Sequence, residues 1–264
     1  MWVFLVLLYG LFKGAREIAK KKALEKSGVM EVLFVYTLLS FLFVVPDAGN
    51  AMGLSGTQLL CVLAKSAVIF VAWICGFQAI ARLPVSLYSV LDLSRVIFST
   101  LLGVCFLGEQ MRTGQSIGLV LVLCGLLLLK APWKKKGGDA DASAGAVALA
   151  LTSCLMNAVS GTMDKVLMRG MNSSQLQFWY MLFLTAMYGA YLLFSRTKIH
   201  WKGTLKNGWI WLMSALFVVA DRALFLANGM PGSQVTVMTL LKQSGVLVSI
   251  LGGYLVFHEK HVGY

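Results

Sequence analysis

The sequence predicts an all-α integral membrane protein made of two inverted five-helix repeats, and three observations lead to this fold class. The first is composition: 58% of the 264 residues are hydrophobic and only 13% are charged, and the mean hydropathy is +0.78. A soluble core could not bury so much apolar surface, so lipid must cover the rest. The second observation is a series of long apolar segments, and the third is an internal repeat.

Nine segments are long and apolar enough to be membrane spans, since a helix needs about 20 mostly apolar residues to cross a bilayer. Turn residues or charges separate them, as at residues 46–50 and at Pro231-Gly232. The first segment lacks a basic start and a small-residue cleavage site, so it reads as a membrane helix and not as a signal peptide. The expected spans are residues 2–19, 30–46, 57–80, 84–107, 114–132, 145–168, 174–195, 208–229 and 233–257.

A polar linker divides the chain after the fifth expected span. Residues 134–144 read KKKGGDADASA, which is small, polar and charged. We therefore expect a first repeat at residues 1–133 and a second at residues 145–264.

The two halves share a repeated pattern in one register. A shift of 150 positions places Glu109 on Glu259 without a gap. Between residues 85–109 and 235–259 it gives eight identities. In the first half these are Val85, Leu91, Ser94, Val96, Ser99, Leu101, Gly103 and Glu109. Such a match in register predicts a duplication.

Five helices per repeat is an odd number, so the second copy enters the membrane upside down. Inverted repeats are typical of transporters, with the substrate site near the midplane where the halves meet. In the same register, the counterpart of the fifth span would begin near Tyr264, where the sequence stops. We therefore expect a tenth helix in the complete protein.

Residues 77–86, leading into residues 94–109, resemble the drug/metabolite transporter superfamily, specifically its ten-helix EamA-like members. The pattern is similar to that family's turn between the third and fourth helices, followed by a fourth helix that ends in Gly108-Glu109. The segments at residues 225–235 and 244–259 repeat it. The resemblance implies a transporter of small metabolites, often amino acids, or of drugs, acting mostly as an exporter.

Ionisable residues inside membrane spans cost about 3 kcal/mol each even on lenient insertion scales, so each one suggests function. The chain has seven basic and four acidic residues of this kind, an excess that favours a zwitterion or an anion as the solute. They are Lys13, Arg16, Glu17, Lys65, Asp92, Arg95, Asp164, Lys165, Asp221, Arg222 and Lys242.

The candidate substrate site follows from spacing. The repeat register places Asp92 on Lys242, so equivalent positions carry opposite charges that could approach each other or flank a zwitterion. Asp221 and Arg222 are adjacent and point about 100° apart on a helix, so they need other partners. We expect the central cavity to be lined by Asp92, Arg95, Asp221, Arg222 and Lys242.

Three further residues complete the candidate site. Gln78 and Asn228 are equivalent in the repeat register and could bond a substrate or a neighbouring helix. Proton coupling could run through Glu17, Asp92 or Asp221. The position of charged residues near span ends favours an anchoring role at the lipid headgroups. The position of Glu109 and Glu259 favours capping or gating. The expected anchors are Lys13, Arg16, Lys65, Asp164 and Lys165.

The net charge of +12 does not indicate nucleic-acid binding, because the basic residues lie in short loops between apolar segments. The sequence has no phosphate-binding loop, no protease or hydrolase motif and no metal-ligand spacing, so we expect no enzyme activity, no cofactor and no metal. The charge bias would place the N-terminus outside, whereas the family resemblance implies both termini inside, and the orientation stays open.

The sequence thus predicts a secondary transporter that exports small polar metabolites, such as amino acids, by alternating access in the cell membrane. Its expected partners are a small-molecule substrate and the lipid bilayer, with a homodimer left open. Two alternatives remain: a nucleotide-sugar or sugar-phosphate exchanger, and a membrane scaffold that transports nothing. A lipid-modifying enzyme would need clustered acidic residues or a nucleophile at one interface, and the sequence has none.

Overall fold

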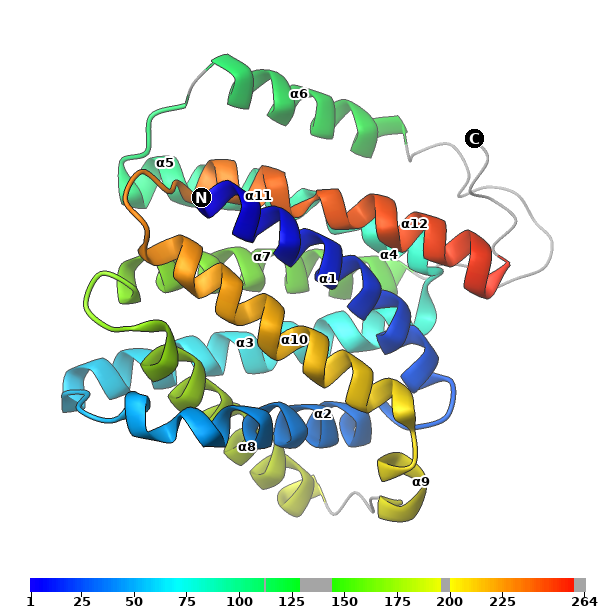
Figure 1. The fold of residues 1–264 in the computed structure, drawn as a ribbon. Coiled ribbons are helices and arrows are strands. Elements are labelled where there is room, and N and C mark those ends of the chain that lie inside the picture. The colour runs from blue at the N-terminus through cyan, green and yellow to red at the C-terminus, as the bar shows by residue number, and fades with distance from the viewer. Residues whose placement is uncertain (112, 129–143, 196–199, 259–264) are drawn as a thin grey trace.

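The computed structural model describes residues 1–111, 113–128, 144–195 and 200–258. These residues form helices and no strands, so the predicted all-α class is confirmed (Figure 1). The elements are α1 (Trp2–Leu24), α2 (Val29–Val44), the 3-10 helix η1 (Val45–Ala51), α3 (Gly56–Arg82), α4 (Val85–Leu91), α5 (Ser94–Leu107), α6 (Thr113–Leu128), α7 (Ala144–Leu167), α8 (Ser173–Ser195), α9 (Trp201–Leu205), α10 (Gly208–Gly229), α11 (Val235–Lys242) and α12 (Ser244–Phe257).

In the described part of the chain, seven helical stretches are long and apolar enough to cross a membrane. They make this a multi-pass membrane protein. Two expected spans differ from these seven. The apolar part of α6 is shorter, at Thr113–Gly125. Helix α1 is long enough but carries six charged side chains, and it continues to Leu24 instead of ending at residue 19. Its charges need polar surroundings inside the bundle.

Two spans that we expected to be continuous are each broken into two helices. Residues 84–107 divide into α4 and α5 at Asp92-Leu93, and residues 233–257 divide into α11 and α12 at Gln243. At both breaks backbone bonds reach back three residues instead of four, as from Leu93 to Val90 and from Gln243 to Leu240. Leu93 and Gln243 are equivalent in the 150-residue register. The two halves therefore break at the same place, although neither break contains proline or glycine.

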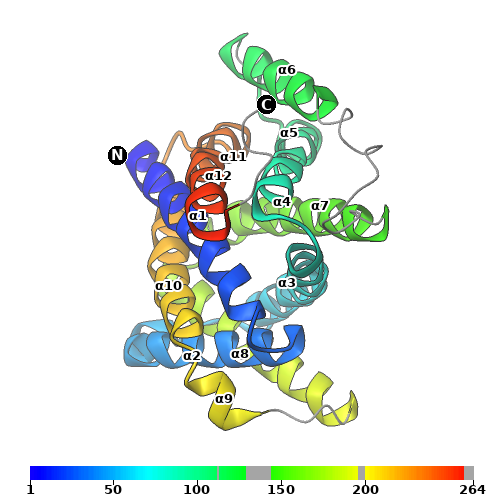
Figure 2. The same ribbon diagram turned by 90° about the vertical axis from the view of Figure 1, so that its right-hand side faces the viewer.

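The packing of the helices is symmetric when the two halves are exchanged. Helix α1 packs on α10 as α7 packs on α3, and α1 packs on α12 as α7 packs on α5. Likewise, α3 packs on α8 as α10 on α2, and α11 on α5 as α4 on α12. Figure 2 shows the resulting ring, and Figure 1 shows α1 and α7 running in opposite directions. Two inverted copies of one unit would produce this pattern.

Helices α1 and α12 approach each other closely because both lack side chains at the contact. A Cβ atom added to Gly245 would lie 2.2 Å from the Gly10 carbonyl oxygen, and one added to Gly14 would lie 2.4 Å from the Gly245 carbonyl oxygen. Small residues allow such close approach in membrane bundles. This contact fixes the position of α1, whose charged half faces the interior.

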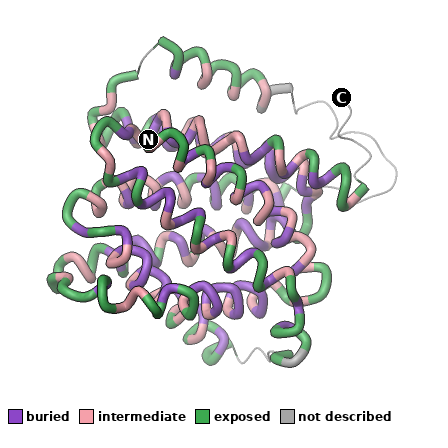
Figure 3. The backbone as a smooth tube through the Cα atoms, viewed as in Figure 1, coloured by how far each residue is buried: buried purple, intermediate pink, exposed green. Residues whose placement is uncertain are grey.

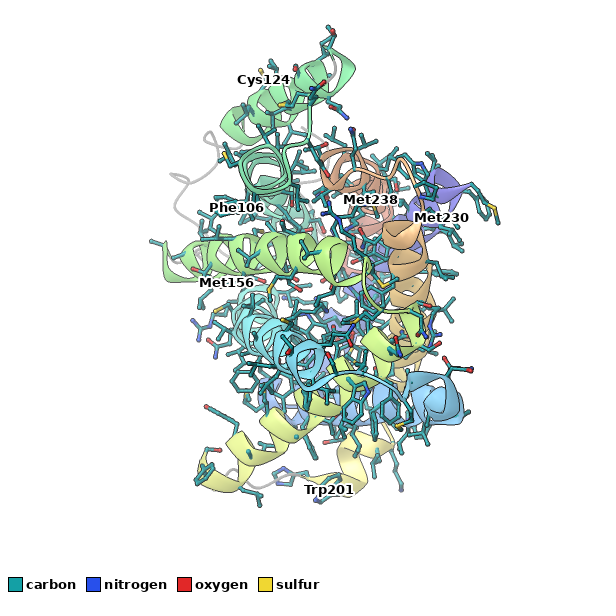
Figure 4. The ribbon with its side chains drawn as sticks, turned by 90° about the vertical axis from the view of Figure 1, so that its left-hand side faces the viewer. Phe106, Cys124, Met156, Trp201, Met230 and Met238 are labelled. Atoms are coloured by element: carbon teal, nitrogen blue, oxygen red, sulfur yellow. The ribbon has the colours of Figure 1, made fainter. Side chains whose placement is uncertain are left out.

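Burial is concentrated among the inner helices, whereas α6 is mostly exposed (Figure 3). Helix α6 packs on α5 and α11 and exposes apolar side chains such as Ile117 and Leu121. Figure 4 shows α6, with Cys124, at one end of the molecule and Trp201 of α9 at the other. An exposed apolar face of this kind suits contact with lipid tails.

Candidate functional site: a charged central cavity

A cavity of about 80 Å³ lies in the middle of the bundle. Helix α1 contributes one face to it, with side chains spaced three or four residues apart, which places them on one side of the helix. These are Tyr9, Lys13, Arg16, Glu17 and Lys20. Four of the six charged side chains of α1 thus face the cavity.

Helix α7 forms the facing wall with a stripe of small and polar residues at the same helical spacing. The stripe consists of Ser153, Asn157, Ser160, Gly161 and Asp164. Between the two walls, α3 supplies Lys65, and the broken helices supply Arg95 and Lys242. Helix α10 adds Asp221.

Aromatic rings close the cavity on the side of α2 and α8. The ring centroids of Trp73 and Phe217 are 5.2 Å apart, and the Tyr36 ring lies 5.3 Å from Trp73 and 5.4 Å from Phe217. All three residues line the cavity. They give the cavity an aromatic wall, and the Arg16 guanidinium packs against its Phe217 ring.

One carboxylate holds two of the cavity's cations. Asp92, at the break between α4 and α5, forms ion pairs with Lys13 of α1 and with Arg95 of α5, the latter at 2.7 Å. Asp92 is 5% exposed and lies directly behind the lining, since both of its partners face the cavity. The break in the helix lets this side chain reach across to α1.

Two further ion pairs line the cavity. Glu17 pairs with Lys20 one turn later on α1 at 2.5 Å. Lys65 of α3 pairs with Asp164 of α7 at 3.0 Å. The Lys65 ammonium also lies 3.5 Å from the centroid of the Tyr180 ring, a favourable cation–π arrangement.

Three charged groups of the lining have no ion-pair partner among the described residues. Asp221 is 7% exposed, and its buried Oδ2 accepts no hydrogen bond from them. The Arg16 guanidinium lies 5.1 Å from the Phe217 ring centroid, and its buried Nη1 donates to none of them. The Lys242 ammonium lies 5.5 Å from the Tyr9 ring centroid. The cavity thus contains two cations and one carboxylate that form no ion pair with the described side chains.

The structure brings four of the predicted site residues to the cavity: Glu17, Arg95, Asp221 and Lys242. Asp92 lies behind it and pairs with Lys13 and Arg95, so the expected approach of Asp92 to Lys242 gives no ion pair.

Three predicted residues do not line this cavity. Arg222 points away and pairs with Asp47 of η1 at 2.7 Å. It also donates to Gln177 at 2.5 Å and to Ser174 at 2.7 Å. Asn228 is buried at the end of α10, where its carbonyl oxygen accepts a bond from Lys165, and Gln78 lies on α3 outside the lining.

Five lining residues were missed as site candidates: Lys13, Arg16, Lys20, Lys65 and Asp164. The expected anchoring of four of them at the headgroups was wrong, since Lys65 is 1% exposed and Asp164 is 6% exposed. A signal was present in the sequence, because the polar residues of α1 and of α7 recur at helical spacing. Distance from the expected span ends was the misleading criterion.

Glu109 links the first half of the chain to a broken helix of the second. Its carboxylate accepts hydrogen bonds from the backbone N–H groups of Val235, at 2.6 Å, and Thr236, at 3.0 Å, at the start of α11. The expected capping role of Glu109 is confirmed, and that of Glu259 lies outside the described residues. Helix α11 carries Lys242 at its other end, so this cap helps to position a cavity residue.

We expect Glu109→Ala to lower the free energy of unfolding by about 1 kcal/mol, because two N–H groups lose their acceptor and the helix N-terminus loses a negative charge. Thermal unfolding of the purified protein in detergent micelles measures the change. Glu25→Ala, which removes an exposed pair with Lys22, is the matched control. Equal melting temperatures for Glu109→Ala and Glu25→Ala would contradict the capping role.

In each half a lysine of the first helix binds the C-terminal end of the third helix, and Figure 1 shows the C-terminal ends of α3 and α10 at opposite ends of the bundle. Lys21 of α1 donates to the carbonyl oxygens of Ile80, at 2.7 Å, and Leu83, at 2.8 Å, at the end of α3. Lys165 of α7 donates to the Asn228 carbonyl oxygen at 2.9 Å, near the end of α10. Each lysine ties the first helix of its half to the third.

No group of three or more His, Cys, Asp or Glu residues that could hold a metal ion occurs in the part of the chain that the structure describes. The charged side chains and aromatic rings that line the cavity suit ionic and hydrogen-bonding recognition.

Comparison with known proteins gives one family. The model of the EamA-like transporter family matches residues 1–131, which fall within the first predicted repeat. No curated protein matches the chain significantly. Among solved structures 23 chains match. One of them, described only as a crystal structure of a protein, has a TM-score of 0.70 at 14% identity and covers 99% of this chain and 90% of its own. At that identity the likeness shows a shared fold.

Proposed function

Because this chain belongs to the EamA-like transporter family, we propose that it is a secondary transporter that exports small polar metabolites, such as amino acids, across the cell membrane. The observation that carries the proposal is the central cavity, which six basic and three acidic side chains line inside an apolar bundle. Charges at membrane depth are costly, and a solute pathway is the usual reason for keeping them.

The substrate contacts that we propose are the groups that line the cavity. Arg95, Asp221 and Lys242 come from different helices and face one space, and Glu17 with Lys20 adds a pair on α1. Asp92 acts indirectly, because it holds Lys13 and Arg95 in place.

Alternating access is supported by the symmetry of the fold. Both halves have a broken helix at the cavity, and both have a lysine contact at one end of the bundle. If the Lys21 and Lys165 contacts open in turn, the same cavity faces one side of the membrane and then the other. In inverted-repeat transporters such rocking moves one set of helices against the other around a fixed site.

The rival functions differ in what the cavity would have to contain. The excess of basic side chains also suits a sugar phosphate, so the counterflow panel includes nucleotide sugars. A scaffold would gain nothing from the unpaired charges of Arg16, Asp221 and Lys242, which only destabilise it.

Solute counterflow in liposomes tests the proposal. The purified protein is reconstituted with a panel of amino acids, organic anions and nucleotide sugars, and uptake of labelled solute against a preloaded excess is measured. We expect counterflow of amino acids and at least a tenfold loss in Asp221→Asn. The control Lys22→Gln, which removes a partly exposed charge outside the cavity, should leave counterflow unaffected. If a folded preparation shows counterflow of none of the solutes tested, the proposed transporter function is wrong.

A further inference from the structure

The charges of the cavity do not balance. With Asp92 behind the lining, six basic and four acidic side chains surround one space. Asp92 neutralises only one of the two cations that it contacts. The pairs Glu17–Lys20 and Lys65–Asp164 balance themselves.

Besides the cation left over beside Asp92, three lining groups form no ion pair with the described residues. Arg16 and Lys242 are cations held over aromatic rings, and Asp221 is a carboxylate with a buried, unbonded oxygen. They come from three helices, α1, α11 and α10, and all face the same cavity. Packing alone does not explain them, because a buried charge without a partner costs several kcal/mol that a hydrophobic residue would not.

A solute with the opposite pattern would neutralise all three groups at once. It needs two anionic groups, for Arg16 and Lys242, and one cationic group, for Asp221. A bidentate carboxylate is the natural partner of a guanidinium, and an ammonium of a buried carboxylate. A solute of that type would also lower the overall positive charge of the cavity.

On the basis of the proposed function, we infer that the preferred substrate is an acidic amino acid, with one ammonium and two carboxylate groups. Its ammonium binds Asp221, and its carboxylates bind Arg16 and Lys242. The rings of Phe217 and Tyr9, which already contact the two cations, hold them in position.

Three solutes of nearly equal size distinguish what the second carboxylate and the ammonium group each contribute to transport. Glutamate carries all three groups, glutamine replaces one carboxylate by a neutral amide, and glutarate lacks the ammonium. Counterflow of each is measured in liposomes that contain the purified protein. We expect glutamate to exceed glutamine and glutarate at least tenfold.

Variants then assign each charge to its residue. Lys242→Gln or Arg16→Gln is expected to remove the preference for glutamate over glutamine, and Asp221→Asn to remove the preference for glutamate over glutarate. Each expected effect is a change in the ratio between the counterflow rates of two solutes. A variant that merely folds less well lowers all three rates and leaves their ratios unchanged. The control Lys22→Gln, outside the cavity, keeps the wild-type ratios.

The outcomes distinguish this inference from the transporter proposal. If glutamine or another neutral amino acid exceeds glutamate, the inference is wrong although transport stands. If no amino acid or organic anion gives counterflow, both are wrong. Ratios unchanged in Asp221→Asn would also overturn the assignment of the ammonium site.

Discussion

Lys65→Met is expected to destabilise the protein by about 3–5 kcal/mol, the range for breaking a buried ion pair from one side. Lys65 is 1% exposed and Asp164 is 6% exposed, and their charged atoms are 3.0 Å apart. Removal of the ammonium leaves the Asp164 carboxylate buried without its partner. The Tyr180 ring also loses the cation that lies 3.5 Å from its centroid. Thermal and denaturant unfolding in detergent micelles measure the loss.

The double variant Lys65→Met/Asp164→Leu separates the ion pair from the packing around it. When both charges are replaced by apolar groups of similar size, the desolvation cost disappears together with the attraction, and stability returns close to the wild-type value. The single and double variants therefore form a mutant cycle with a large coupling energy. If the double variant were as unstable as the sum of the two single variants, the two charges would not act as a pair.

Gly245→Val is expected to have the second large effect, because α1 and α12 meet with their backbones in contact. A Cβ atom at Gly245 would lie 2.2 Å from the Gly10 carbonyl oxygen, which is backbone and cannot turn aside. Overpacking of this kind costs about 1–3 kcal/mol or forces the helices apart. Since α1 carries five lining residues of the cavity, we expect counterflow to be lost together with stability.

A glycine with open space around its α-carbon is the matched control. Gly125 of α6 has no atom within 4 Å of an added Cβ, so Gly125→Ala should leave melting temperature and transport unchanged or raise stability slightly, as alanine favours a helix. Equal behaviour of Gly245→Val and Gly125→Ala would contradict the close contact of α1 and α12.

The spans were predictable because bilayer thickness fixes how long an apolar segment must be. The breaks at Leu93 and Gln243 were not, since neither contains proline or glycine. At the first break the Ser94 hydroxyl donates to the Leu91 carbonyl oxygen at 2.7 Å, so a side chain competes with the backbone there. At the second break the buried side-chain amide of Gln243 forms no hydrogen bond with the described residues. The repeat register still predicts that a helix break in one half has an equivalent break in the other half.

The sequence predicts which charged residues lie inside the membrane spans, but it does not predict which of them line one cavity. Asp221 and Arg222 are neighbours in sequence, yet only Asp221 lines the cavity, while Arg222 pairs with Asp47 on η1. Lys65 and Asp164, which we expected at the headgroups, form a buried pair between α3 and α7. In each case the partner comes from a distant part of the chain.

The sequence by itself determined the membrane environment, the approximate spans, the repeat register and which residues carry charge into the bundle. These follow from local rules, because the length and composition of each segment decide whether it can enter lipid. Only the tertiary structure decided which charges meet and which stay unpaired. That choice depends on how each helix is rotated and how closely it packs. The glycine contact of α1 with α12 sets both for the helix that carries four of the nine charged lining residues.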